Sequence, residues 1–134
     1  MPRVTAEQIA RLMETAPSAW FDDVRDRAIM WLFIATDAEP SELARMRPDD
    51  VDLGSGSVAL KDRNGSTRAC ALRPEAIAAL KEYVAARARW PHAVIYGLWL
   101  GGSGEMGSEE IVRVARDRGA RAGLGDVLHP PHEH

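Results

Sequence analysis

An unbroken apolar run from Ala28 to Ala35 constrains the fold of this chain more than any other feature of its sequence. Acidic residues at 22 and 23 precede the run and favour a helix that begins around residues 21–23. The segment from Asp37 to Pro40 then breaks the helix. A helix that is apolar on all sides is buried on all sides, so we expect this one at the centre of the domain. The run is far too short to cross a bilayer, which takes about 20 residues.

Shorter patterns on both sides of this run predict the remaining elements. Thr5 and Gln8 have the spacing of a helix capping box, and Arg63-Asn64-Gly65 has the composition of a hairpin turn. The other spacings predict a first helix that ends near Ala16-Pro17, helices over 41–46, over 74–89 and from a Ser108 cap to Gly123, strands over 58–60 and 67–72, a strand or extended run over 96–100, and a turn over 101–104. The sequence therefore predicts a single α+β domain over residues 1–134, mostly helical, with a small antiparallel sheet made of a β-hairpin and a short third strand.

The charge balance limits the partners of the domain. Its 17 basic and 20 acidic residues give a net charge of −3. Nonspecific affinity for DNA comes mostly from neutralising phosphates, so we expect weak DNA binding unless the cations are clustered. The single cysteine, Cys70, excludes an internal disulfide and suits a reducing compartment. No basic-then-apolar leader opens the sequence, and we expect a cytoplasmic protein.

Several motifs occur in an order that resembles a known family. They are the segments 25–53 (RDRAIMWLFIATDAEPSELARMRPDDVDL) and 61–72 (KDRNGSTRACAL), then Trp99-Leu-Gly with Glu105-Met and Ile111, and finally His129-Pro130. Together they resemble the catalytic domain of the tyrosine recombinases, or phage integrases. In that family the first run reads roughly RDRA…ATGLR-SEL--LR--D-DL, and the last pair opens an HPHxLRH motif. The likeness begins at about Val4 and implies the fold of roughly the first two-thirds of that domain.

The resemblance implies a defined chemistry. In the family two arginines and a histidine hold the scissile phosphate, a hairpin lysine protonates the departing 5′-hydroxyl, and a tyrosine attacks phosphorus to form a covalent phosphotyrosyl link. The position of the first arginine is Glu39 in this chain. Two unit charges ~4 Å apart repel by about 4 kcal/mol at an effective dielectric of about 20, so an acid there pushes a phosphate away. A plain solvated turn residue would not hold the phosphate either.

The hairpin lysine of the family aligns with Arg63, which is a poor proton donor because its pKa lies above ~12. Lys61 could replace it only if the turn were rebuilt. Residual contact with DNA is expected from cations of the hairpin and of the last helix, namely Lys61, Arg63, Arg68, Arg113 and Arg116. Alternatively, the hairpin cations are ordinary exposed charges. On this alternative the last helix has a solvated face with Arg113, Arg116, Arg118 and Arg121, which spread over about half of its circumference.

The C-terminal motif departs furthest from the family pattern. A one-residue insertion places His132 at the catalytic histidine, whereas an ungapped alignment places Pro131 there and His134 at the second arginine. In either alignment the second arginine and the segment with the nucleophile are missing from the sequence. His129, His132 and His134 lack a second ligand cluster at a usual spacing, so we expect no metal site. No cofactor is expected.

The two tyrosines of the sequence, Tyr83 and Tyr96, lie far upstream of the position that the family nucleophile occupies. Tyr83 shares a predicted helix with Ile77 and Leu80, so we expect it to be packed. Tyr96 is expected to belong to the short apolar strand. Neither is a candidate nucleophile.

These substitutions lead to one functional hypothesis and two alternatives. The hypothesis is a truncated, degenerate integrase-like domain, or remnant of a mobile element, without strand-cleaving activity and with at most weak DNA contact. The first alternative is a protein-interaction module that dimerises or regulates an intact recombinase, because loss of the C-terminal third would uncover apolar surface. The second alternative is an active enzyme completed in trans or a fragment of a longer chain, and Glu39 argues against it. No membrane and no small-molecule substrate is expected.

Overall fold

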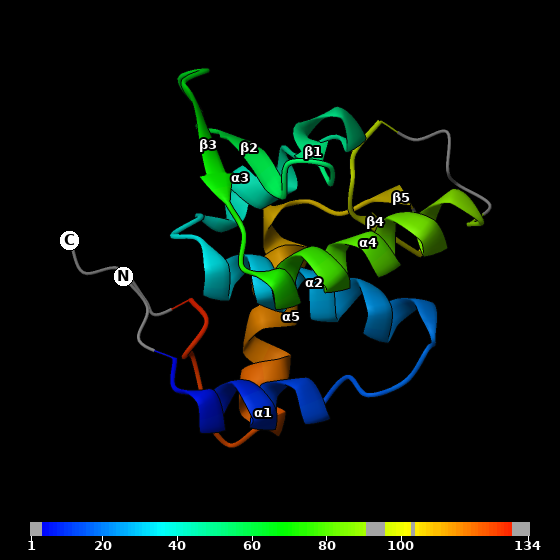
Figure 1. Cartoon of the computed structure of the whole chain (residues 1–134). Helices are drawn as coiled ribbons and strands as arrows, with labels where there is room; N and C mark the ends of the chain where they lie inside the picture. Colours follow the sequence, from blue (N-terminus) through cyan, green and yellow to red (C-terminus); the bar gives the residue numbers. More distant parts are fainter. Residues whose placement is uncertain (1–3, 91–95, 103, 130–134) are drawn as a thin grey trace.

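The computed structural model describes residues 4–90, 96–102 and 104–129 (Figure 1). Its helices are α1 (Ala6–Glu14), α2 (Phe21–Ala35), α3 (Pro40–Ala44), α4 (Pro74–Ala88) and α5 (Ser108–Arg121), with a 3-10 turn, η1 (Pro48–Asp50). Its strands are β1 (Val51–Asp52), β2 (Ser57–Lys61), β3 (Thr67–Ala71), β4 (Leu100–Gly101) and β5 (Gly104–Glu105). The predicted α+β class, mostly helical with small antiparallel sheets, is confirmed.

Helix α2 lies at the centre of the domain, as its apolar run predicts. Every residue from Ala28 to Phe33 is at most 8% exposed. Both α4 and α5 pack against α2, and α4 makes the larger contact (Figure 1). Burying one large aliphatic side chain stabilises the fold by about 1.5–3 kcal/mol, so this helix contributes much of the core. Among the described residues, no helix combines the length and the hydropathy that crossing a membrane requires.

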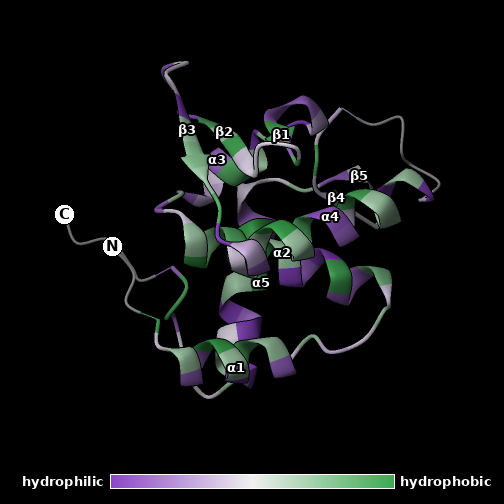
Figure 2. Cartoon of the chain, in the orientation of Figure 1, coloured by the Kyte–Doolittle hydropathy of each residue, from purple (hydrophilic) through white to green (hydrophobic). Residues whose placement is uncertain are grey.

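The main sheet has three antiparallel strands in the order β1-β2-β3, and β2 is coloured as hydrophobic in Figure 2. In the β2–β3 hairpin Val58 pairs with Cys70 and Leu60 with Arg68. Val58 and Leu60 point into the core, at 2% and 0% exposed, whereas most of β3 is exposed. The hairpin is thus anchored through β2 and presents β3 to solvent.

The strand or extended run predicted over residues 96–100 is not the third strand of this sheet. The third strand is β1, and only Leu100 of the predicted segment is in a strand, β4, which pairs with β5 in a separate two-stranded sheet. Leu98 N–H instead donates to the carbonyl of Met46 (2.9 Å), and Trp99 accepts from Met106 N–H (2.8 Å). Residues 97–100 are buried against the core. Their apolar pattern therefore reflects burial, and they are not part of the main sheet.

The helix boundaries follow local chemistry, with two corrections. Thr5 Oγ1 accepts from Gln8 N–H (3.1 Å) and Gln8 Oε1 accepts from Thr5 N–H (2.9 Å), which confirms the capping box. Helix α1 ends at Glu14, earlier than predicted. Ser108 is not the cap of α5: the cap is Gly107, whose N–H donates to Glu110 Oε1 (3.0 Å).

Candidate functional site

Position 39 lies at a tightly built junction between α2 and α3. Thr36 Oγ1 donates to the carbonyl of Leu32 (2.7 Å) and accepts from Ala38 N–H (3.1 Å), so the chain turns sharply where α2 ends. Glu39 is the N-cap of α3, and its N–H donates to Glu42 Oε1 (2.8 Å). Its side chain is half-buried. The junction therefore holds a carboxylate at the position where the family resemblance expects an arginine.

Glu42 of α3 forms an ion pair with Arg68 of β3. The guanidinium approaches the two carboxylate oxygens at 2.5 and 3.3 Å, and the side chain of Glu42 is only 6% exposed. Burial alone would lower the pKa of Arg68, but the hydrogen bond and the charge of Glu42 raise it above its ordinary value. A buried carboxylate needs a hydrogen-bonded cation. Arg68 is therefore neutralised by Glu42, although its side chain is partly exposed, and it is a poor candidate for holding a phosphate at the same time.

The other two candidate cations of the hairpin differ from each other. Lys61 Nζ lies 3.6 Å from Asp50 Oδ1, and that carboxylate is only 9% exposed. Arg63 is in the turn and exposed, and it has no hydrogen bond or ion pair within the described ranges of the chain. Asp62 Oδ1 shapes the turn by accepting from the N–H groups of Asn64 (2.8 Å) and Ser66 (3.0 Å). The tip of the hairpin thus presents a cation that is free to meet an anion.

The candidate cations of α5, Arg113 and Arg116, are exposed. They lie on a helix that packs against α1, α2 and α3, whereas the tip of the β2–β3 hairpin extends away from the body of the domain (Figure 1). The five cations predicted to meet DNA therefore divide between two surfaces. Two of them are paired with carboxylates of the domain, at 2.5 Å for Arg68 and 3.6 Å for Lys61.

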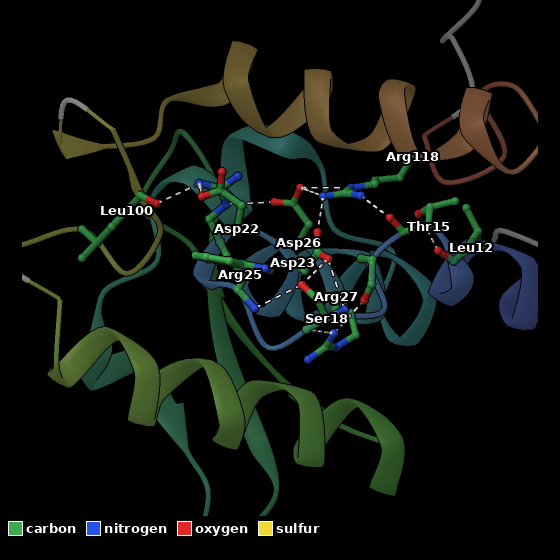
Figure 3. Close-up of polar contacts among 12 residues, drawn as sticks. Leu12, Thr15, Ser18, Asp22, Asp23, Arg25, Asp26, Arg27, Leu100 and Arg118 are labelled. Carbon is green, nitrogen blue, oxygen red and sulfur yellow. Dashed lines mark hydrogen bonds and ion pairs between the residues drawn. The ribbon is translucent and has the colours of Figure 1, made fainter.

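Arg118 corrects the expectation that the arginines of the last helix form a solvated face. It is 7% exposed, and its Nη2 donates to Asp23 Oδ1 (3.0 Å) and Asp26 Oδ2 (2.9 Å), while Nε donates to Asp26 Oδ2 (3.1 Å) (Figure 3). The carbonyl of Thr15 also accepts from Nη1. Arg25 Nε donates to the other oxygen of Asp26 (2.9 Å). We call Asp23, Arg25, Asp26 and Arg118 the buried arginine network.

A signal for the buried arginine network is present in the sequence. Arg118 lies seven residues after Ile111 and four after Val114, and both of these are buried. This spacing places Arg118 on the apolar stripe of α5. A cation on such a stripe needs a buried carboxylate opposite it.

The C-terminal candidate, His132, lies outside the described residues, as do Pro131 and His134. The ring of His129 stacks near that of Phe33, with the centroids 6.2 Å apart. No group of three or more histidine, cysteine, aspartate or glutamate side chains is arranged to hold a metal ion in the described ranges.

The two tyrosines have opposite environments. Tyr83 is fully buried: its Oη donates to the carbonyl of Leu98 (2.8 Å) and accepts from Leu100 N–H (2.9 Å). This burial confirms the prediction that Tyr83 is packed, and it raises the pKa of Tyr83 to about 12. Tyr96 is 75% exposed, and Arg47 Cζ lies 4.6 Å from its ring centroid.

Three known proteins are similar to this chain, one in sequence and two in structure. Tyrosine recombinase XerC of Chromobacterium violaceum is 28% identical over 109 residues, which make up 81% of this chain and 36% of XerC. The crystal structure of XerA recombinase superposes with a TM-score of 0.79 and 25% identity, covering 96% of this chain and 47% of XerA. XerH recombinase, solved bound to its difH substrate, superposes with a TM-score of 0.72 and 18% identity, covering 96% of this chain and 40% of XerH.

The chain thus spans less than half the length of each of these relatives. The sequence profile of the Phage integrase family matches residues 2–133. The central α2, the α3 junction and the β2–β3 hairpin lie within that match. The chain therefore belongs to the phage integrase family.

Proposed function

We propose that this chain is an integrase-like domain that does not cleave DNA, a pseudoenzyme of the family. The observation that carries the proposal is Glu39, a carboxylate at the N-cap of α3, where the family has a phosphate-binding arginine. A phosphate ~4 Å from this carboxylate would be repelled by about 4 kcal/mol at an effective dielectric of about 20. Arg63, at the position of the hairpin lysine, would be a poor acid for the leaving hydroxyl.

Covalent trapping tests this proposal. The protein is incubated with supercoiled plasmids that carry candidate recombination sites, and the mixture is denatured and resolved to reveal protein bound covalently to DNA. An intact recombinase on its own site is the positive control. We expect no adduct from this chain or from Glu39→Arg, because Arg63 remains a poor acid and Tyr83 remains buried. An adduct formed by the unaltered chain would refute the proposal.

The domain retains weak contact with DNA in this proposal. Arg63 at the hairpin tip and Arg113 and Arg116 on α5 are exposed, and Lys61 and Arg68 contribute less because Asp50 and Glu42 neutralise them. The structural likeness to XerH, solved on DNA, supports this assignment. A titration with duplex DNA at two salt concentrations tests it, since phosphate contacts weaken steeply with salt. No binding at low salt would remove this part of the proposal.

A protein-interaction module that regulates an intact recombinase is the second candidate function. The observation that favours it is Trp20, which is 80% exposed and lines an apolar hollow of the surface together with Phe21 and Trp90. Exposed apolar patches commonly mark partner surfaces. In this proposal the domain, derived from a mobile element, acts in the cytoplasm, where Cys70 stays reduced. Co-purification with an intact recombinase of the same cell tests it, and Trp20→Ala should abolish the capture.

A further inference from the structure

An apolar hollow of about 660 Å³ opens where α2 begins and α4 ends. It is lined by residues 18–22 and by Trp90, and we call it the Trp20 hollow. The rings of Phe21 and Trp90 stack on each other, with centroids 4.1 Å apart and planes 10° apart. Trp20 projects beside this stack with 80% of its surface exposed. The surface therefore combines a projecting aromatic side chain and an aromatic recess.

The backbone that carries Trp20 is held by the buried arginine network. Trp20 N–H donates to Ser18 Oγ (3.1 Å), and that hydroxyl donates to Asp23 Oδ2 (2.7 Å). Asp23 in turn accepts from Arg118 (3.0 Å), and Figure 3 shows Ser18, Asp23 and Arg118 in one cluster. An anchor on a fixed backbone loses little conformational freedom on binding, which favours affinity. An exposed indole on such a support is suited to insert into a partner.

A second, polar hollow of about 610 Å³ adjoins the first and shares Asp22 and Trp90 with it. Four arginines and four carboxylates line it, so its formal charges cancel. A polyanion such as nucleic acid gains nothing from a neutral lining. A protein surface of mixed charge meets it without net repulsion, and aromatic anchors surrounded by a polar rim are typical of protein interfaces. The charge distribution therefore favours a protein occupant.

We propose that the Trp20 hollow is the interface with a second copy of this chain, in which each Trp20 inserts beside the Phe21–Trp90 stack of its partner. A two-fold interface requires one patch that contains both the projecting group and its recess, and this patch has both. The residues of the hollow lie where α2 begins and α4 ends, and both of these helix ends are far from the tip of the β2–β3 hairpin in Figure 1. Pairing through the hollow therefore leaves Arg63 open to solvent. The inference deepens the second candidate function and does not depend on DNA contact.

Sedimentation velocity over a wide range of protein concentrations tests the interface. We expect a monomer–dimer equilibrium in which Trp20→Ala and Trp20→Glu raise the dissociation constant by about thirtyfold or more, as for a central aromatic anchor. Tyr96→Ala is the matched control, because Tyr96 is the other large exposed hydrophobic residue in the described ranges, at 75% against 80% for Trp20. This control should leave the dimer unchanged. Because Trp20 is exposed, its substitution should not unfold the domain.

Acrylamide quenching supplies a readout at the same residue. Trp20 is the most exposed of the four tryptophans, so its fluorescence should become protected as the concentration rises and the dimer forms. A monomer at every concentration, or a dimer that Trp20→Ala and Trp20→Glu leave intact, overturns the proposal. A heteromer with an intact recombinase, formed by a chain that does not pair with itself, also overturns it while upholding the second candidate function.

Discussion

Two of the arginine–carboxylate clusters in the domain differ in burial, and the difference separates stability from function. In the buried arginine network, Arg118 and Asp26 have side chains only 8% and 7% exposed. In the hairpin pair, Glu42 is 6% exposed but Arg68 is 47% exposed. Breaking the first cluster leaves buried carboxylates without part of their neutralising charge. Breaking the second leaves the partly exposed guanidinium of Arg68 without its carboxylate. The first cluster should therefore govern folding, and the second should govern how much positive charge the hairpin offers to an anion.

The largest expected effect is that of Arg118→Ala. The substitution leaves Asp23 without a guanidinium and Asp26 with that of Arg25 alone. Loss of one partner of a buried pair costs about 3–5 kcal/mol. Urea unfolding followed by circular dichroism measures the change. Arg113→Ala, on the exposed side of the same helix, is the matched control and should stay within about 0.5 kcal/mol of the wild type. Equal losses in both variants would contradict the assigned difference in burial.

A smaller effect on stability, but a gain in DNA affinity, is expected for Glu42→Gln. The amide keeps a hydrogen bond to Arg68 but removes the charge, so we expect a loss of about 1 kcal/mol in unfolding free energy. The charge of Arg68 is then no longer neutralised, so the salt dependence of DNA binding should steepen by about 0.9 in log–log slope. Glu75→Gln is the control, because it changes the net charge equally at a pair, Arg73–Glu75, in which both side chains are about half exposed. If Glu75→Gln gained the same DNA affinity, the change in net charge alone would explain the effect of Glu42→Gln.

Asp23 gives the buried arginine network a dependence on pH. Burial alone would raise the pKa of Asp23, but hydrogen bonds from Ser18 and the charge of Arg118 outweigh it and lower the pKa below its ordinary 3.8. The stability that Asp23 contributes is therefore complete well above pH 3.8 and is lost as the pH falls through the lowered value. Asp23→Asn should flatten this acid part of a plot of unfolding free energy against pH. A profile as steep as that of the wild type would contradict the role given to Asp23.

The smallest change in stability is expected for Arg63→Ala, because this side chain has no hydrogen bond or ion pair in the described part of the chain. The unfolding free energy should stay within about 0.5 kcal/mol of the wild type. The log–log slope of DNA affinity against salt concentration should become shallower by about 0.9, which is the contribution of one phosphate contact. Arg89→Ala, at another exposed arginine, is the control of equal charge. An unchanged slope for Arg63→Ala would place the DNA contact elsewhere.

The sequence predicts those parts of the fold that depend on local patterns. The apolar run of α2 and the Thr5–Gln8 capping box need only neighbouring residues, and both are confirmed. The third strand escaped prediction because β1 has two residues, which is too short for an alternating pattern to be visible. The apolar residues from 97 to 100 were a misleading signal, since they pack in the core without joining the main sheet.

The candidate site divides in the same way. The positions of Glu39 and Arg63 in the site could be predicted, because the order of the motifs aligns them with the first arginine and the hairpin lysine of the family without any structure. Glu42 and Arg68 are 26 residues apart, and no periodicity connects a short helix with a strand edge at that distance. Their pairing, which neutralises one of the cations expected to meet DNA, becomes visible only when the hairpin is folded onto α3. The carboxylates that pair with Arg118 likewise could not be predicted from the sequence. The place of Arg118 on the apolar stripe of α5 could be predicted.

The ion pair between Arg118 and Asp26 has a kinetic consequence. Its two residues are separated by 92 positions in the chain, so its formation closes a long loop and costs conformational entropy that local contacts do not cost. Contacts made after the rate-limiting step slow escape from the native state without accelerating its formation. We therefore expect this salt bridge to form after that step, so that its removal accelerates unfolding more than it slows refolding.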